Sequence, residues 1–352
     1  MADLAKPTRG TSIGIAAPVA LESEVDALAR FGATELYTGV TVERWTERFG
    51  GLAWLNRRGA GIGNPNLLGL ERLVAEANRC SLPVAVALNA PYYTRSQLPD
   101  VVALCAELAA LGVRRVIVSD PGLILALRAA GSPLAISASS VAAIRNQGAV
   151  EFYRDLGVQR VILPRHMSLD DIARIRDGVP DVELEVFVLN DGCTYEEGSC
   201  LTTHAAGAFC LTEWRYDFSR LDGAPVAAEE QTALDQNAAD YKEWIWYLSN
   251  CGRALSPRRL PNGPCGLCAI SEFRRVGVDC LKIVGREAHP ARKALSLQLV
   301  KAVVDKLGEG ATGQEAAAFA RDVRDTPELC GSGYMCYYRE ASSSTPAATT
   351  SR

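Results

Sequence analysis

The chain has 352 residues, of which 48% are hydrophobic and 22% are charged, and its formal net charge is −4. This composition is typical of a globular protein and excludes a low-complexity chain, and the lack of a basic excess argues against a dedicated nucleic-acid-binding protein. The sequence shows neither a signal peptide nor a run of about 18 apolar residues, so we expect a cytoplasmic protein without a membrane span.

Short β-branched runs alternate with amphipathic helical stretches. In chain order we expect strands at 13–18, 35–40, 84–89, 115–120, 134–139, 160–165, 184–190 and 280–286. Helical stretches between them include 22–31, 70–78, 98–111, 149–156 and 169–177. Most of the strands are near-continuous apolar runs, as in parallel strands that are buried on both faces. Eight such units close most simply into a TIM-like (β/α)8 barrel, and an open doubly wound sheet is the structural alternative.

The regular alternation breaks between the seventh and eighth strands. Residues 191–279 form a long cysteine-rich insertion, and a connection of this length is usually functional. We expect the barrel to comprise residues 10–190 and 280–310, followed by a C-terminal extension over 311–340. The last residues, 341–352, are rich in Ser, Thr and Ala and are expected to be a disordered tail.

Eleven cysteines are more than packing requires, and disulfides are not expected in a reducing compartment. Cys80, Cys105 and Cys280 lie in apolar stretches and are expected to be small buried hydrophobic residues. Clustered thiolates on loops are what an iron–sulfur cluster requires, whereas zinc usually shows tight C-x2-C pairs, of which the chain has one. The other eight cysteines lie outside the regular units: Cys193, Cys200, Cys210, Cys251, Cys265, Cys268, Cys330 and Cys336.

These eight cysteines divide in two ways. In the first, the four that come first in the chain hold one metal centre and the last four form a second site. In the second, a single cluster is closed by Cys265 or Cys268, and the remaining thiols bind no metal. The sequence alone leaves both groupings open.

Polar side chains gather near the C-terminal ends of the predicted strands. On a barrel these ends converge on one mouth, where arginines can clamp a carboxylate or a phosphate. An alternative for Arg165 is an ion pair with Glu185 inside the barrel. The polar set includes Asn64, Ser137, Ser139 and Asn190 together with the five predicted catalytic or substrate-binding residues, which are Arg58, Asn89, Arg165, Lys282 and Arg286.

Several short motifs occur in a characteristic order: Ala16-Ala-Pro18, Leu36-Tyr-Thr-Gly39, Asn56-Arg-Arg58 through Asn64, Cys193-x6-Cys200, and Gly277-Val-Asp-Cys-Leu-Lys-Ile-Val-Gly-Arg286. Their order and spacing resemble those of the peptidase U32 family, the collagenase-like peptidases. The likeness is closest to the members that perform oxygen-independent hydroxylation in ubiquinone synthesis, and it covers about residues 16 to 303. The chain departs from the family at Val284, where the family has a glutamate.

The resemblance implies a TIM-like barrel that carries a [4Fe-4S] cluster. Cys193 and Cys200 match two of its ligands directly, and Cys210 and Cys251 are similar to the other two. It further implies an iron–sulfur enzyme that catalyses or assists oxygen-independent hydroxylation of an organic substrate. We expect that substrate to be a small anionic molecule held by the arginines and lysine at the mouth.

Three alternatives stay open. A peptidase is one, although the chain shows no metalloprotease helix motif and no G-x-S-x-G elbow. An RNA-modifying hydroxylation enzyme is another, but the acidic balance counts against it, and nucleic acid is not an expected partner. The third is a non-catalytic partner of a second U32-family protein.

Overall fold

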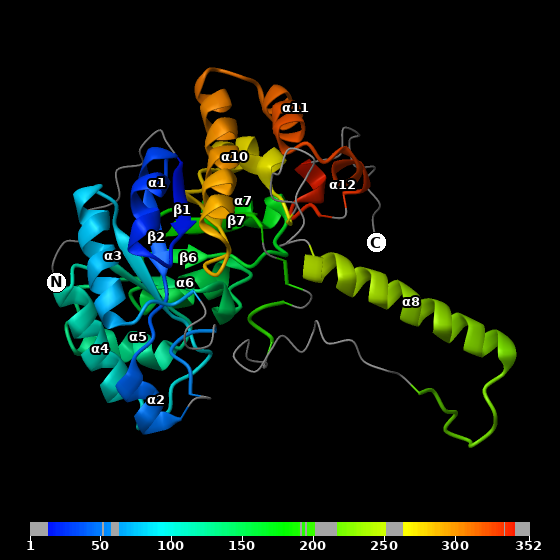
Figure 1. Ribbon diagram of the computed structural model, residues 1–352, viewed down its shortest axis with the longest axis horizontal. Helices are drawn as coiled ribbons and strands as arrows, with labels where there is room; N and C mark the ends of the chain where they lie inside the picture. The colour runs from blue at the N-terminus through cyan, green and yellow to red at the C-terminus, as the bar shows by residue number, and fades with distance from the viewer. Residues whose placement is uncertain are drawn as a thin grey trace.

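Eight parallel strands form a closed barrel in chain order (Figure 1). The computed structural model describes residues 13–50, 53–57, 63–190, 192–193, 196–200, 217–250, 263–333 and 335–341, and only the backbone of 244–250. The closed sheet confirms the predicted (β/α)8 barrel and excludes the open doubly wound sheet. The strands are β1 (Gly14–Pro18), β2 (Glu35–Thr38), β3 (Val84–Leu88), β4 (Arg115–Val118), β5 (Ala135–Ala138), β6 (Arg160–Ile162), β7 (Glu183–Leu189) and β8 (Cys280–Ile283).

Helices cover the outside of the barrel. Their first turns are often capped by a side-chain oxygen, as where Asn66 and Ser168 accept hydrogen bonds from the backbone of the helices that follow them. The helices are α1 (Val25–Arg30), α2 (Glu43–Phe49), α3 (Leu67–Arg79), α4 (Leu98–Ala110), α5 (Pro121–Ala129), α6 (Gln147–Asp155), α7 (Leu169–Gly178), α8 (Ala228–Asn250), α9 (Ile270–Val276), α10 (Pro290–Gly308), α11 (Gly313–Arg324) and α12 (Pro327–Ser332).

The core has two layers. The larger lies between the strands and the surrounding helices, and β3, whose five residues are all buried, contributes to both layers. The smaller lies inside the barrel, where alanines at 16, 85 and 87 face Tyr37 and Phe187. Because several of these interior residues are small, the barrel interior has room for charged side chains, which are described below.

The expected insertion divides into two parts. Helix α8 stands clear of the barrel (Figure 1), and its described side chains, 228–243, are exposed or half-exposed. Helix α9 packs against α7 and α10, so it completes the barrel wall between β7 and β8. It ends at Gly277, whose φ of 84° lets the chain turn sharply into β8.

The C-terminal extension returns to the barrel. Helix α11 packs against α10, and α12 follows it (Figure 1). Of the predicted tail, 341–352, only Ala341 is described, in the short 3-10 helix η6 (Arg339–Ala341), and the rest lies outside the described residues. Among the described helices, none is long and apolar enough to cross a membrane.

Candidate active site at the barrel mouth

A short segment after β7, residues 196–200, is fixed at the C-terminal mouth of the barrel by Glu197. The Glu197 carboxylate accepts a hydrogen bond from Arg165 over 2.7 Å, and both side chains are buried. The backbone oxygen of Glu197 accepts a second hydrogen bond from the Arg57 guanidinium. Arg165 also lies over the ring of Phe187, 3.9 Å from its centroid. Two loops thus hold this segment through one residue.

The neighbouring residue, Glu196, anchors the same segment to the loop after β5. Its carboxylate pairs with Arg145 and accepts a hydrogen bond from the Ser199 backbone over 2.8 Å. Burial acts to raise the pKa of Glu196, but the Gly198 N–H and Arg145 hold it below its usual value. A Cβ at Gly198 would lie 2.6 Å from the Ala143 side chain, so the contact there requires glycine. Cys193 precedes this anchored segment, and Cys200 is its last residue.

The two ends of the insertion meet at Asn190, directly after β7. Asn190 has a φ of 116°, which a non-glycine residue rarely adopts. Its backbone N–H donates to the Pro264 oxygen over 3.2 Å, and a Cβ at Gly263 would lie 2.4 Å from the Asn190 oxygen. The pairing of β7 with β8 is also irregular between Phe187 and Leu189. Such irregularities recur beside active sites because they redirect the chain.

On the other side of the mouth, Arg286 is held by two asparagines. Its guanidinium donates to the side-chain oxygens of Asn64 and Asn56 over 2.9 and 3.2 Å, and all three residues are buried. Asn89 belongs to the same rim and donates to the Ser139 hydroxyl over 3.0 Å. The structure therefore places Asn89, Arg165 and Arg286 at the mouth, as the sequence predicts.

Gly39, which follows β2, provides the space for the Arg286 contacts. A Cβ at this position would lie 2.0 Å from the Asn64 side-chain oxygen and 2.1 Å from a guanidinium nitrogen of Arg286. We expect Gly39→Ala to lower the free energy of unfolding by about 1–3 kcal/mol, because buried side chains must move. Urea unfolding measures this, with Gly308→Ala, which has open space around it, as the control. Equal stabilities of the two variants would contradict the account.

Lys282 lies deeper, inside the barrel. Its ammonium pairs with Glu185 over 2.5 Å and lies 3.8 Å from the centroid of the Tyr37 ring. Arg160 pairs with the same carboxylate over 3.0 Å and also with Glu35. The partner of Arg165 is Glu197, so the predicted alternative of an Arg165–Glu185 pair is wrong. The error arises because β6 ends at Ile162, which carries Arg165 past the barrel interior.

Glu35, Glu185 and Cys280 bring three ligand atoms within 4.8 Å of one another in the barrel interior. Burial, followed by the nearby Glu35, raises the pKa of the Cys280 thiol well above its usual value, so it stays protonated. Both carboxylates already pair with Arg160 or Lys282. A metal ion would have to displace these cations, so we interpret the group as a buried ion-pair network.

Three buried polar atoms on the segments at the mouth have no hydrogen-bond partner within the described part of the chain. They are the indole nitrogen of Trp54, which lies in the segment 53–57, and one carboxylate oxygen each of Glu196 and Glu197. A buried donor or acceptor without a partner costs about 1–3 kcal/mol. Each such atom in a native structure requires an explanation, such as a catalytic role, a bound ion or an ordered water.

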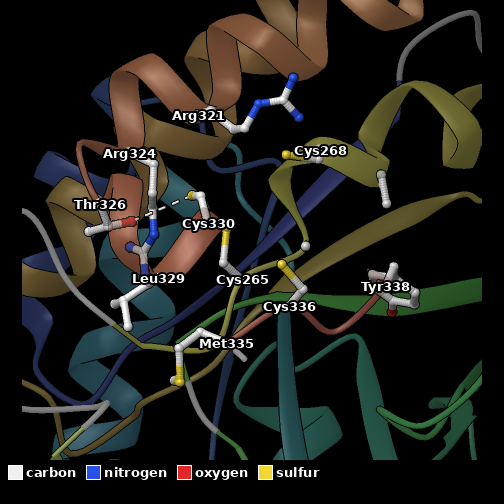
Figure 2. A pocket seen from close by; sticks show the side chains of 12 residues that line it. Cys265, Cys268, Arg321, Arg324, Thr326, Leu329, Cys330, Met335, Cys336 and Tyr338 are labelled. Carbon is white, nitrogen blue, oxygen red and sulfur yellow. Dashed lines mark hydrogen bonds between the residues drawn. The ribbon is translucent and has the colours of Figure 1, made fainter. Parts of the chain in front are cut away.

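The remaining predicted site residues divide into three groups. Arg58, Cys210 and Cys251 lie outside the described residues. Cys193 and Cys200 are half-buried at the mouth. Four further cysteines line one pocket beside α11 and α12 (Figure 2): Cys265, Cys268, Cys330 and Cys336.

Sequence reasoning missed Glu197 and left Arg57 out of the predicted set. Arg57 adjoins Arg58 in the asparagine–arginine motif, so the motif contained the signal. For Glu197 the only signal was a carboxylate between two cysteines after the seventh strand, which does not distinguish it from Glu196.

Comparison with known proteins adds a family and three curated relatives. The family model described as Peptidase family U32 matches residues 22–345. The tRNA hydroxylation protein P of Haemophilus influenzae is 45% identical over 85 residues, which are 24% of this chain and 18% of that protein. The tRNA hydroxylation protein P1 of Bacillus subtilis is 27% identical over 209 residues, 56% of this chain and 44% of that protein.

A third relative is named for ribosomal RNA. The 23S rRNA 5-hydroxycytidine C2501 synthase of Escherichia coli is 29% identical over 140 residues, which are 40% of this chain and 21% of that protein. The matches span less than half the length of each of the three relatives.

These relatives correct the expectation of a small-molecule substrate and of a protein without a nucleic-acid partner. All three are named for the hydroxylation of tRNA or rRNA, so that expectation is wrong. Its basis was net charge, which is a sum over the whole chain. Residues 217–243 hold seven acidic and two basic side chains, an excess that alone exceeds the net charge of −4. Net charge thus masks the arginines at the mouth.

Proposed function

Because the chain belongs to peptidase family U32, and because its relatives are named for RNA hydroxylation, we propose that it catalyses or assists the hydroxylation of a nucleotide in tRNA or rRNA. The observation that carries the proposal is the anchored segment 196–200. This segment sets Cys200 and a buried carboxylate at a mouth lined by arginines, and one oxygen of that carboxylate has no partner among the described residues. Cys193 precedes the segment.

The proposed cofactor is a [4Fe-4S] cluster held by Cys193, Cys200, Cys210 and Cys251. The first two follow the mouth end of β7 on either side of Glu197, and thiolates are the donors that such clusters take, so the described part of the donor set fits. When bound, the cluster supplies electron-transfer chemistry. Arg57 and Arg165, by holding Glu197, position the segment that bears Cys200.

The mouth offers groups that suit a nucleotide. An enzyme that modifies a base takes it out of the stack and binds it by hydrogen bonds to its edge. We propose that the Trp54 nitrogen and the Glu197 oxygen, which have no partner among the described residues, supply one donor and one acceptor for that edge. Arg286 has its guanidinium oriented by Asn56 and Asn64, and a guanidinium held in one orientation loses little side-chain entropy when it binds a phosphate.

Nucleoside mass spectrometry tests the proposal. The gene is deleted, and nucleosides from the purified tRNA and rRNA fractions are compared with those of the parent strain. We expect one nucleoside heavier than its precursor by one oxygen atom to disappear from one RNA fraction and to return with the wild-type gene. Identical nucleoside profiles in both fractions would reject the proposal.

A further inference from the structure

Four cysteines outside the proposed catalytic site line one pocket. Cys265 and Cys268 come from the start of the segment that leads into α9, Cys330 lies in α12, and Cys336 follows it. Figure 2 shows their sulfur atoms arranged around a common space. Four thiols from two distant parts of the chain therefore converge at one place.

Backbone pairing holds these two parts together. The Cys265 N–H donates to the Met335 oxygen over 2.8 Å, and the Cys265 oxygen accepts from the Tyr337 N–H over 2.9 Å. These two bonds form a parallel bridge between Cys265 and Cys336. Gly266 in turn donates to the Val188 oxygen in β7 over 2.8 Å. Backbone hydrogen bonds at the mouth end of β7 thus hold the two cysteine-bearing parts of the chain together.

The side chains around the pocket complete the arrangement. The Tyr338 hydroxyl donates to the Phe187 oxygen over 3.1 Å, and a Cβ at Gly266 would lie 2.9 Å from the Tyr338 ring. Arg324 is only 2% exposed, lines the pocket and donates to the Gly263 oxygen. A buried guanidinium beside four thiols offsets the negative charge that four metal-bound thiolates bring.

The thiols influence one another. Burial, and after it the neighbouring Cys265 thiol, raises the pKa of Cys268 to about 12, and Cys330 and Cys336 act in the same direction. Burial also raises the pKa of Cys265, although Arg324 opposes the rise. A metal that binds these thiols replaces their protons.

We infer that Cys265, Cys268, Cys330 and Cys336 hold a second metal centre, an iron–sulfur cluster of the [4Fe-4S] type, beside the barrel mouth. The inference does not depend on the proposed function. This cluster would fasten the C-terminal extension to β7, since two of its ligands come from each side of the Cys265–Cys336 bridge.

The spacing of the thiols favours a cluster over a single zinc ion. Tetrahedral zinc, with Zn–S bonds of about 2.3 Å, brings thiolates to about 3.8 Å from one another. Among the described residues, the only set of three ligand atoms that lie within 4.8 Å of one another is in the barrel interior, so no three of these sulfurs are that close. A cubane binds each thiolate at a different corner and therefore holds its ligands farther apart.

Iron and acid-labile sulfide, measured on full-length protein purified without oxygen, test the inference. The proteins are the wild type, Cys193→Ala/Cys200→Ala, Cys265→Ala/Cys268→Ala, and Cys80→Ala as the control. We expect about eight irons in the wild type and the control and about four in each double variant, each with a broad visible band. Wild-type iron in the Cys265→Ala/Cys268→Ala protein would overturn the inference, as would zinc in place of iron at this site.

The Cys193→Ala/Cys200→Ala protein tests the second centre even if the Cys265→Ala/Cys268→Ala protein misfolds, because it leaves all four proposed ligands unchanged. About four irons in this protein, together with a reducible signal in electron paramagnetic resonance, support the second centre even where the other double variant does not fold. No iron in it, with a folded circular dichroism spectrum, would contradict the inference. Four irons in the wild type that are lost only with Cys265 and Cys268 would uphold the second centre and reject the cofactor of the proposed function.

Discussion

Replacing Cys193 with alanine is expected to lower the amount of the hydroxylated nucleoside by about 100-fold or more. Loss of an outer-shell partner at a metal site already costs about 10–100-fold, so loss of a ligand costs at least as much. The measurement is nucleoside mass spectrometry on a deletion strain that carries the variant gene. Cys80, at the end of α3 and away from the mouth, provides the matched control, and Cys80→Ala is expected to restore the wild-type level.

Protein abundance separates loss of chemistry from loss of protein. Immunoblotting of the same cultures is expected to show the Cys193→Ala protein at a level near that of the wild type, since Cys193 is half-buried and lies outside the barrel core. A Cys193→Ala strain that keeps the hydroxylated nucleoside would show that the cysteines at the mouth are not needed for the reaction.

Replacing Lys282 with methionine is expected to have the largest effect on stability, about 3–5 kcal/mol at neutral pH. Removing one partner of a buried ion pair leaves the other charge without compensation. Of its two cationic partners among the described residues, Glu185 then keeps Arg160, which it contacts over 3.0 Å. Urea unfolding measures the loss. The control is Lys301→Met, which breaks an exposed pair with Asp305 and is expected to cost about 0.5 kcal/mol or less.

The effect of Lys282→Met depends on pH in a defined direction. Burial acts to raise the pKa of Glu185, but Lys282 and Arg160 together hold it below its usual value. The pair therefore stabilises the fold above the unfolded pKa of about 4.3, and this contribution is lost as the pH falls. We expect the stability gap between wild type and variant to narrow below about pH 4.3. A gap that stays constant from neutral pH to well below about pH 4.3 would contradict the ion-pair account.

The barrel could be predicted because its signal is local. Each strand is a short apolar run and each helix has its own periodicity and cap, so eight units are visible one at a time. The predicted strands extend too far at their C-terminal ends: 160–165 ends at Ile162, and 280–286 ends at Ile283. The polar residues that follow these strands leave the sheet to form the mouth, and alternation alone does not mark where the hydrogen-bonded ladder stops.

The candidate site could be predicted only in part, because its decisive contacts join distant parts of the chain. Strand-end position was enough to place Asn89 and Arg286 at the mouth. It could not reveal that Arg165 pairs with Glu197 across 32 positions. Likewise the cysteines at 265–268 and 330–336 could be named, but their convergence depends on a backbone bridge that no local pattern encodes.

The central claim is that the segment at the mouth supports RNA hydroxylation, and Glu197→Gln tests it most directly. This change removes the charge that pairs with Arg165 but keeps the size of the side chain and the backbone bond from Arg57. The measurement is the hydroxylated nucleoside in a deletion strain complemented with Glu197→Gln or with the exposed control Glu272→Gln. We predict a fall of about 10–100-fold for Glu197→Gln at unchanged protein abundance, and no change for the control. Wild-type hydroxylation in the Glu197→Gln strain would contradict the account.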